Sequence, residues 1–412
     1  MVCIIDQESN VLKISATVLL VLISLPASMF AVDKPKIIVF PLEKQLKGAG
    51  LQWLGEGIAL SISDQLDTQD LSSVDRVELL RLVEGLDLPP GAPLSRGSMI
   101  RVAQNAGADF LVMGVISGRE QNLKISVRVL DVKALKLGGE MVANGPFTAL
   151  TQMENELAWL ILSNNGLAPA YSRERFQGRT RKVPNTAYAY YVQSFEASGE
   201  DDKLHLLLKA VEIYRDFPEA QFRIGSLYFN RGNCGSAIPH LTLGRGSKST
   251  QLDGDFMRGT CYIQVDQPTL AIQTLWNLLQ VSRSAEVLNN LGVAYLRKGD
   301  TALAVSSFMD ARNLARTDST VLLNVSLIRH LQGNDTAARS VLEDAVQLHP
   351  KNGMLQFLTG IVLKTQGDNE RALAAIAKAR ELGVNTERLQ AEDPKLWSQV
   401  LLNFEARQNS QP

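Results

Sequence analysis

Residues 291–311 read LGVAYLRKGDTALAVSSFMDA, and this stretch decides how the carboxyl-terminal half of the chain folds. Two small residues, Gly292 and Ala304, stand twelve positions apart, and each is followed by an aromatic residue, Tyr295 or Phe308. A glycine-containing turn separates the two apolar patterns, which predicts a pair of helices. Because two helix backbones approach closely only over small side chains, we expect the two helices to cross at Gly292 and Ala304.

The same pattern recurs along the chain every 33 or 34 residues. Its alanines are Ala237, Ala271, Ala304, Ala338 and Ala372, and the small residues twelve positions before them are Gly225, Gly259, Gly292, Ser326 and Gly360. This pattern, L-G-x₂-Y followed by A-x₃-F, resembles the tetratricopeptide repeat. The resemblance implies an all-α, right-handed superhelix of about six repeats over residues 184–386, with a divergent first repeat.

Residues 387–412 follow the last repeat. Apolar residues recur at helical spacing within 394–406, at Leu396, Trp397, Val400, Leu401 and Phe404. The terminal repeat of a stack must shield its apolar face. We therefore expect a helix over 394–406 that caps the open end of the last repeat.

Residues 34–166 alternate between strand and helix patterns. Residues 36–40 form a short apolar run that ends at Pro41, which is typical of a buried strand. Residues 123–131 alternate between apolar and polar side chains, which indicates a sheet with one face covered by helices. The predicted element order is β-α-β-α-α-β-β-β-α, an α/β layer domain.

Four blocks of this domain resemble a known family: WLGEG at 53–57, SVDR at 73–76, GADFLVMG at 107–114 and RVLDV at 128–132. They are similar to the envelope domain shared by the amino-terminal part of TolB and the curli secretion lipoprotein CsgG. The resemblance implies a cell-envelope module that contacts other proteins and performs no chemistry. The chain lacks the acylated cysteine of the lipoproteins and the propeller of TolB, so pore and translocation roles are not implied.

The amino terminus has the pattern of a targeting segment. Residues 14–25 (ISATVLLVLISL) carry no charge, Lys13 precedes them, and small residues follow up to Ala31. This order predicts a signal peptide over residues 1–31 and a secreted protein of the periplasm or cell envelope. The alternative is an uncleaved anchor helix over 14–32, in which case the protein would be attached to the membrane.

Two cysteines, Cys234 and Cys261, remain in the mature chain after such cleavage. In an oxidising compartment they could form a disulfide. We favour the alternative that they are two separate buried thiols on different helices.

A basic stretch over residues 167–183 separates the two folded units. It carries five Lys or Arg against one Glu, a charge of +4. The favoured interpretation is a solvated linker, and the alternative is a contact for an acidic partner or lipid headgroups.

Composition argues against catalysis and against nucleic-acid binding. The 412 residues carry 42 Lys and Arg against 43 Asp and Glu, so the chain lacks the excess cations that hold phosphates. The four histidines have no acidic or cysteine neighbour at metal-ligand spacing, and no nucleotide-binding or nucleophile motif occurs. We therefore expect no enzyme activity, cofactor, metal, nucleotide or nucleic acid.

The binding surface is placed by the repeat register. In the repeat proteins that this chain resembles, the first helix of each pair lines a concave groove. The corresponding residues are Phe222, Arg223, Phe229, Phe256, Asn289, Asn290, Arg297, Asn324, Leu327 and His330. Apolar pockets and exposed amides suit an extended peptide, although the phenylalanines are equally consistent with inter-helix core.

The ligand predicted for this groove is an internal segment of a partner protein. Position 2 of the repeats holds Glu219, Asp253, Glu286 and Thr320, where a clamp for a free carboxyl terminus needs lysine. The sequence thus predicts a non-enzymatic protein–protein interaction scaffold of the bacterial cell envelope. The alternative is a membrane-anchored sensor or effector ectodomain with an uncleaved amino-terminal helix.

Overall fold

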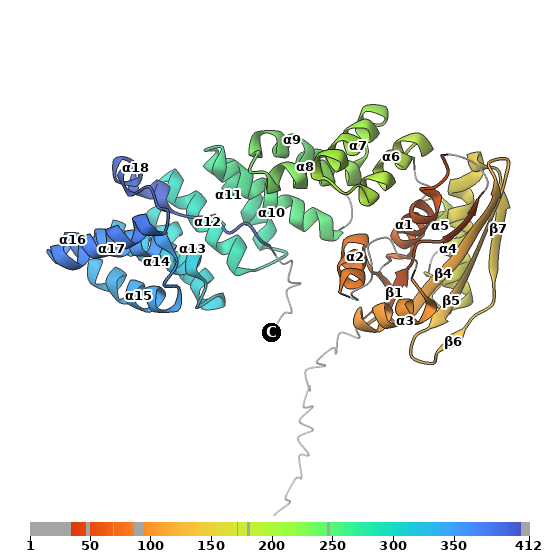
Figure 1. Cartoon of the computed structure of the whole chain (residues 1–412), viewed down its shortest axis with the longest axis horizontal. Helices are drawn as coiled ribbons and strands as arrows, with labels where there is room; N and C mark the ends of the chain where they lie inside the picture. Colours follow the sequence, from red (N-terminus) through yellow and green to blue (C-terminus); the bar gives the residue numbers. More distant parts are fainter. Residues whose placement is uncertain are drawn as a thin grey trace, which may run out of the picture.

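The computed structural model describes residues 34–46, 50–68, 70–85, 94–170, 172–178, 182–244 and 248–404. The signal peptide predicted over residues 1–31 lies outside these ranges and remains a prediction. Figure 1 shows an α/β domain followed by a curved array of helices. No helix within the described ranges is both long enough and apolar enough to cross a bilayer.

A twisted mixed sheet forms the α/β domain. Its strands are β1 (Lys36–Val39), β2 (Glu43–Leu46), β3 (Ser72–Ser73), β4 (Phe110–Arg119), β5 (Asn122–Asp131), β6 (Lys136–Leu137) and β7 (Met141–Gly145). The sheet order is β3-β1-β4-β5-β6, with β2 also paired to β4 and β7 to β5. Strands β1, β2 and β3 make parallel pairs, whereas β4, β5, β6 and β7 are antiparallel neighbours.

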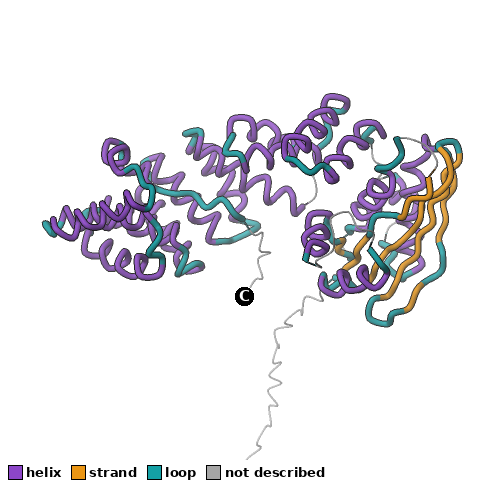
Figure 2. The backbone as a smooth tube through the Cα atoms, in the orientation of Figure 1, coloured by secondary structure: helices purple, strands orange, loops and turns teal. Residues whose placement is uncertain are grey.

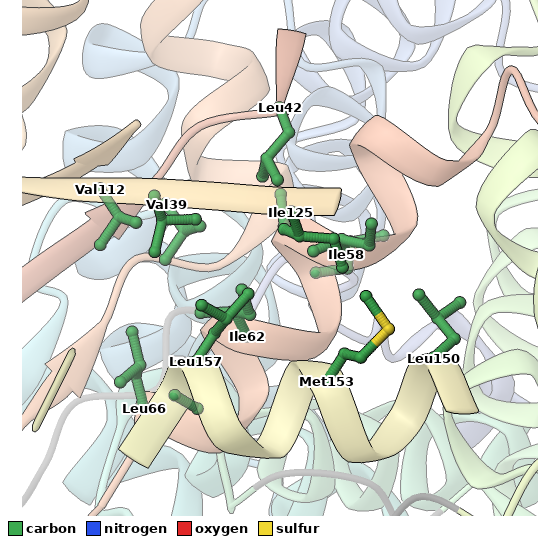
Figure 3. Close-up of a cluster of buried hydrophobic side chains, with 14 of the residues drawn as sticks. Val39, Leu42, Ile58, Ile62, Leu66, Val112, Ile125, Leu150, Met153 and Leu157 are labelled. Carbon is green, nitrogen blue, oxygen red and sulfur yellow. The ribbon is translucent and has the colours of Figure 1, made fainter. Parts of the chain in front are cut away.

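Helices cover both faces of this sheet. Helices α1 (Leu54–Leu66) and α4 (Leu150–Asn164) lie on one face, and Figure 3 shows their apolar side chains meeting those of the strands. Helices α2 (Arg76–Glu84) and α3 (Arg96–Asn105) pack against the other face. Alternation along β1 explains the two layers: Ile37 and Val39 belong to the first core, and Ile38 to the second.

Two short strands depart from the predicted element order. The predicted order has no strand over the residues of β2 or β6, and neither segment shows an apolar alternation. Most of the β2 side chains are exposed, and the strand exists through its parallel pairing with the second half of β4. Pairing of an exposed strand depends on main-chain hydrogen bonds, which leave no apolar signature in the sequence.

The helical array follows the α/β domain. Its helices are α6 (Asn185–Glu196), α7 (Glu200–Ile213), α8 (Pro218–Asn230), α9 (Cys234–Leu243), α10 (Lys248–Gln264), α11 (Pro268–Leu279), α12 (Ala285–Lys298), α13 (Thr301–Leu314), α14 (Ser319–Leu331), α15 (Asp335–Leu348), α16 (Gly353–Thr365) and α17 (Asn369–Glu381). Sequential helices pack as hairpins, and the hairpins stack side by side into a superhelix (Figures 1 and 2).

Small residues lie where the paired helices cross, as predicted. A β-carbon added at Gly292 would lie 2.6 Å from the Phe308 ring, and one at Gly360 would lie 2.5 Å from the Ile376 side chain. Side chains cap the helix starts: Ser284 accepts a hydrogen bond from the Val287 N–H at the start of α12. The helix pairs therefore form at the positions that the repeat pattern indicates.

The basic linker is partly structured. It contains the short helix α5 (Arg173–Gln177), whose Phe176 is 1% exposed and packs against Trp159 of α4. The picture of a fully solvated connector is therefore wrong for this part of it. An apolar side chain in the middle of the basic stretch holds the linker on the α/β domain.

The α/β domain and the first helix pair share one hydrophobic core. Tyr188 of α6 donates a hydrogen bond to the Gly57 carbonyl at 3.0 Å, and its ring lies 6.0 Å from that of Trp53. The same buried cluster continues from the sheet through α6 and α7 to Ile224 of α8. The two units are thus joined by packing as well as by the linker.

Asp253 of α10 is electrostatically coupled to the α/β domain. Burial, reinforced by the charge of Asp75, raises the pKa of Asp253 to about 6, while Arg81 opposes the shift. A carboxyl with a raised pKa in the folded state binds its proton more tightly when folded. The free energy of unfolding therefore falls as pH rises from the ordinary carboxyl range, about 4, toward 6.

We expect Asp253→Asn to raise the melting temperature at pH 7.5 and to change it much less at pH 4.5. The amide removes a charge that is costly only above the raised pKa. Thermal unfolding followed by circular dichroism at both pH values measures the difference, with the exposed Glu212→Gln as the control. Equal stabilisation at both pH values would show that Asp253 ionises normally.

Cys234 and Cys261 form a disulfide, contrary to the favoured interpretation of two separate thiols. The bond links α9 to α10, with the two Cα atoms 4.9 Å apart. The two cysteines lie on helices of successive pairs, and only the stacking of those pairs brings them within bonding distance. Phe229 and Leu241 bury the bond in a small apolar cluster.

Removing this disulfide is expected to destabilise the array. The bond spans a sequence separation of 27, and closing a loop of this length in the unfolded chain contributes about 3–4 kcal/mol. We therefore expect Cys234→Ala with Cys261→Ala to lower the urea midpoint. A reducing agent should lower the wild-type midpoint similarly and leave that of the double variant unchanged. A wild-type midpoint that does not respond to full reduction would contradict this.

Candidate functional site: an asparagine row that holds an extended segment

The carboxyl-terminal segment turns back across the array. After α17 come α18 (Thr386–Ala391) and the 3₁₀ turn η2 (Pro394–Trp397), and the chain then runs without helix or strand from Ser398 to Phe404. Figure 2 shows this stretch as a loop that passes from α18 across α12 toward α10. We call residues 398–404 the tail segment.

The helix predicted over 394–406 is therefore wrong. Only its first turn forms. The Asp393 side chain accepts a hydrogen bond from the Lys395 N–H at the start of this turn, and the turn ends at Ser398, whose backbone is extended, with φ −62° and ψ 136°. The apolar residues of this stretch do not cover the open end of the last repeat. They lie along the first helices of four successive pairs, α10, α12, α14 and α16. Hydrogen bonds from the main chain of this stretch to side chains of the array replace the main-chain hydrogen bonds of a helix.

Three asparagines pair with the main chain of the tail segment. Asn290 donates to the Leu401 carbonyl at 2.8 Å and accepts from the Leu401 N–H at 2.7 Å. Asn324 donates to the Gln399 carbonyl at 2.7 Å and accepts from the Gln399 N–H at 2.9 Å. Asn289 also donates to the Gln399 carbonyl, at 3.0 Å. We call Asn289, Asn290 and Asn324 the asparagine row.

The asparagine row is held in place by its own hydrogen bonds. Asn324 donates to the Asn289 oxygen at 2.8 Å, and Asn289 donates to the Asn290 oxygen at 3.1 Å. Asn290 also donates to the Thr260 hydroxyl at 2.9 Å. This network fixes which end of each amide faces the tail segment. A side-chain amide offers the same donor and acceptor as a peptide group, so the row acts like the edge of a neighbouring strand.

The asparagines are buried, although the sequence predicted them to be exposed. All three are 0% exposed. The groove was predicted to be open, whereas the tail segment of the same chain covers it. Burial makes their hydrogen bonds more important, because an unpaired buried amide is costly.

Aromatic contacts flank the asparagine row on both sides. Phe404 stacks on Phe256 of α10, with ring centroids 4.6 Å apart and planes 11° apart. Trp397 meets Phe357 of α16 edge to face at 5.0 Å, and its indole N–H donates to the Leu389 carbonyl at 2.9 Å. The tail segment is thus held by main-chain hydrogen bonds at its centre and by the Phe404 ring at its far end, and Trp397 anchors the chain just before it.

Four of the ten predicted groove residues contact the tail segment: Phe256, Asn289, Asn290 and Asn324. Phe222 and Phe229 instead pack around the disulfide, and Leu327 is buried in the core of the array. The structure thus divides the predicted phenylalanines between ligand contact and inter-helix core.

The other three predicted residues link neighbouring helices. Arg223 lies over the Phe195 ring at 3.8 Å, and burial lowers its pKa. Arg297 donates to the Ile263 carbonyl at 2.9 Å, near the end of α10. His330 forms a hydrogen bond with Asp335 at 2.6 Å. These contacts hold the stack together at a distance from the tail segment.

Two participants were absent from the predicted set of groove residues. Thr260 orients Asn290, and the tail segment itself is the ligand. A signal for the row existed in the sequence: Asn290 and Asn324 stand at the same position of successive repeats, 34 residues apart, and each lies two residues before the small residue of its first helix, Gly292 or Ser326. The tail segment gave no such signal, because its apolar spacing is equally compatible with a helix.

Comparison with known proteins identifies the class of repeat. Tetratricopeptide repeat models match residues 285–318 and 332–383. The chain therefore contains tetratricopeptide repeats, and this prediction is confirmed. Proteins of this class act as protein-interaction scaffolds and are generally not enzymes. Among the described residues, no group of three or more His, Cys, Asp or Glu could hold a metal ion.

Several solved structures are similar to part of this chain. MamA is 20% identical over 41% of this chain and 96% of its own, with a TM-score of 0.34. YrrB, described as a TPR protein with an unusual peptide-binding site, is 14% identical over 45% of this chain and 98% of its own, with a TM-score of 0.35. A chain of the Cut9–Hcn1 complex is 16% identical over 51% of this chain and 43% of its own, with a TM-score of 0.40. No curated protein sequence matches.

Proposed function

We propose that this protein is an interaction scaffold whose asparagine row binds the main chain of an extended segment from a partner protein. The observation that carries the proposal is the two-way pairing of Gln399 and Leu401, whose N–H and C=O groups both bond to asparagine side chains. Any extended chain presents these groups at the same spacing. A partner segment can therefore take the place of the tail segment.

The bound segment is internal to the partner. The tail segment supports this, because it contacts the row through main-chain groups and has further residues after it. At position 2, where a clamp for a terminal carboxylate holds lysine, the described repeats carry Glu219, Asp253, Glu286 and Thr320.

An envelope location is part of the proposal. The uncharged run at 14–25 favours export, and the Cys234–Cys261 disulfide suits an oxidising compartment. The resemblance of residues 34–166 to the TolB and CsgG envelope domain favours the same location and a second docking surface. Retention of residues 14–32 would instead make the protein a membrane-anchored sensor or effector ectodomain, which sequencing of the mature amino terminus distinguishes.

Crosslinking and affinity capture from cell envelopes test the scaffold function. Leu401→Pro removes the N–H that Asn290 accepts, so it should detach the tail segment and expose the row. We expect this full-length variant to capture its partner more strongly than the wild type. Adding Asn290→Ala and Asn324→Ala should abolish the gain. Equal capture by the wild type, the Leu401→Pro variant and the triple variant would indicate that the partner binds the α/β domain instead.

A further inference from the structure

We infer that the tail segment is an exchangeable internal ligand, and that the partner segment replacing it carries two adjacent aliphatic residues followed, after two unconstrained positions, by an aromatic residue. The inference rests on the proposed function and specifies its ligand. In this chain the pattern is Val400-Leu401-x-x-Phe404. The residues aligned with Gln399 and Leu401 cannot be proline.

The exchangeability follows from how the tail segment is held. None of its side chains carries a charge, and its central contacts are main-chain hydrogen bonds that any extended chain could make. Leu402 is 53% exposed. By contrast, Trp397 is 6% exposed and is fixed by the Leu389 carbonyl. The segment after Trp397 can leave while Trp397 stays in the core.

The side-chain pattern follows from which residues reach the array. Val400, Leu401 and Phe404 pack against the hydrophobic cluster of the repeats, and Phe404 stacks on the nearly fully buried Phe256. Leu402 and Asn403 are exposed, so their identity is free. The main chain supplies affinity for any sequence, and the aliphatic pair and the aromatic residue set the register.

The internal ligand weakens binding from outside. A segment tethered by a short linker is present at an effective concentration on the order of millimolar. A partner must therefore exceed the tail segment in affinity or in local concentration. The array would then bind only segments that fit the side-chain pattern. A segment that makes the main-chain hydrogen bonds alone would bind no more tightly than the tail segment and would not displace it.

Fluorescence anisotropy with a labelled, end-capped peptide of residues 398–406 tests the inference. Three full-length proteins are compared: wild type, Leu401→Pro and the matched control Leu402→Pro, whose N–H donates to no described residue. We expect Leu401→Pro to bind the peptide at least tenfold more tightly than the other two. Phe404→Ala in the peptide should weaken binding about tenfold, and Leu401→Pro in the peptide should abolish it.

Each alternative outcome is distinct. Equal binding of the native, Phe404→Ala and scrambled peptides by the Leu401→Pro protein would overturn the side-chain pattern but leave main-chain recognition intact. Equal binding by wild type and Leu401→Pro would show that the tail segment does not compete. No binding of any peptide by any variant would overturn the proposed function itself. If the wild type is a dimer and the Leu401→Pro variant is a monomer, the asparagine row binds the tail segment of a second copy of the chain.

Discussion

Replacing Trp53 by alanine is expected to lower the free energy of unfolding by about 3–5 kcal/mol, the usual cost of emptying a buried aromatic site. Trp53 is 4% exposed, and its ring meets those of Phe147 and Tyr188 edge to face. Since Tyr188 belongs to the first helix of the array, the change also weakens the junction. We expect one cooperative transition in the wild type and two in the variant.

Trp276→Ala provides the control for this experiment. Trp276 lies on α11 and is 49% exposed, so its removal should cost about 0.5 kcal/mol or less. Urea unfolding followed by far-ultraviolet circular dichroism measures both variants. A similar small loss for Trp53→Ala would mean that the α/β domain and the array do not share a core in solution.

Replacing Asn290 and Asn324 together by alanine is expected to weaken peptide binding by roughly 1,000-fold. The two side chains make four hydrogen bonds to the main chain of the tail segment. At about 1 kcal/mol for each bond, their loss corresponds to about 4 kcal/mol, or roughly three decades in affinity. The effect is measured in the Leu401→Pro protein, in which the row is free, with the labelled peptide of residues 398–406.

The control for the asparagine pair is a second pair on the same array. Asn277 of α11 and Asn313 of α13 are exposed on second helices, away from the tail segment. Asn277→Ala with Asn313→Ala should leave the affinity within twofold. If both double variants lose binding equally, the loss reflects general damage to the array and not the removal of main-chain partners.

The array could be predicted from the sequence because its determinants are local. Gly292 and Gly360 stand at fixed distances from Phe308 and Ile376, and the sequence spacing alone specifies those contacts. The same register placed Asn289, Asn290 and Asn324 on first helices. These positions repeat, so one well-formed unit defines the others.

The remaining features depend on contacts between distant segments. The exposed strand β2 forms only through pairing with β4, and the disulfide forms only because two helix pairs stack. Docking of the tail segment joins Leu401 to Asn290 across 111 residues. The apolar spacing of the tail segment fits a helix equally well. The segment is extended because the asparagine row bonds the N–H and C=O groups of Gln399 and Leu401.

Hydrogen–deuterium exchange of the Gln399, Leu401 and Leu402 amides tests most directly whether the asparagine row recognises a main chain. In the wild-type protein the Gln399 and Leu401 N–H groups should exchange slowly, because Asn324 and Asn290 accept their hydrogen bonds. The Leu402 amide should exchange fast, and in the Asn290→Ala, Asn324→Ala variant all three should do so. Equally fast exchange of all three amides in the wild type would contradict main-chain recognition by the row.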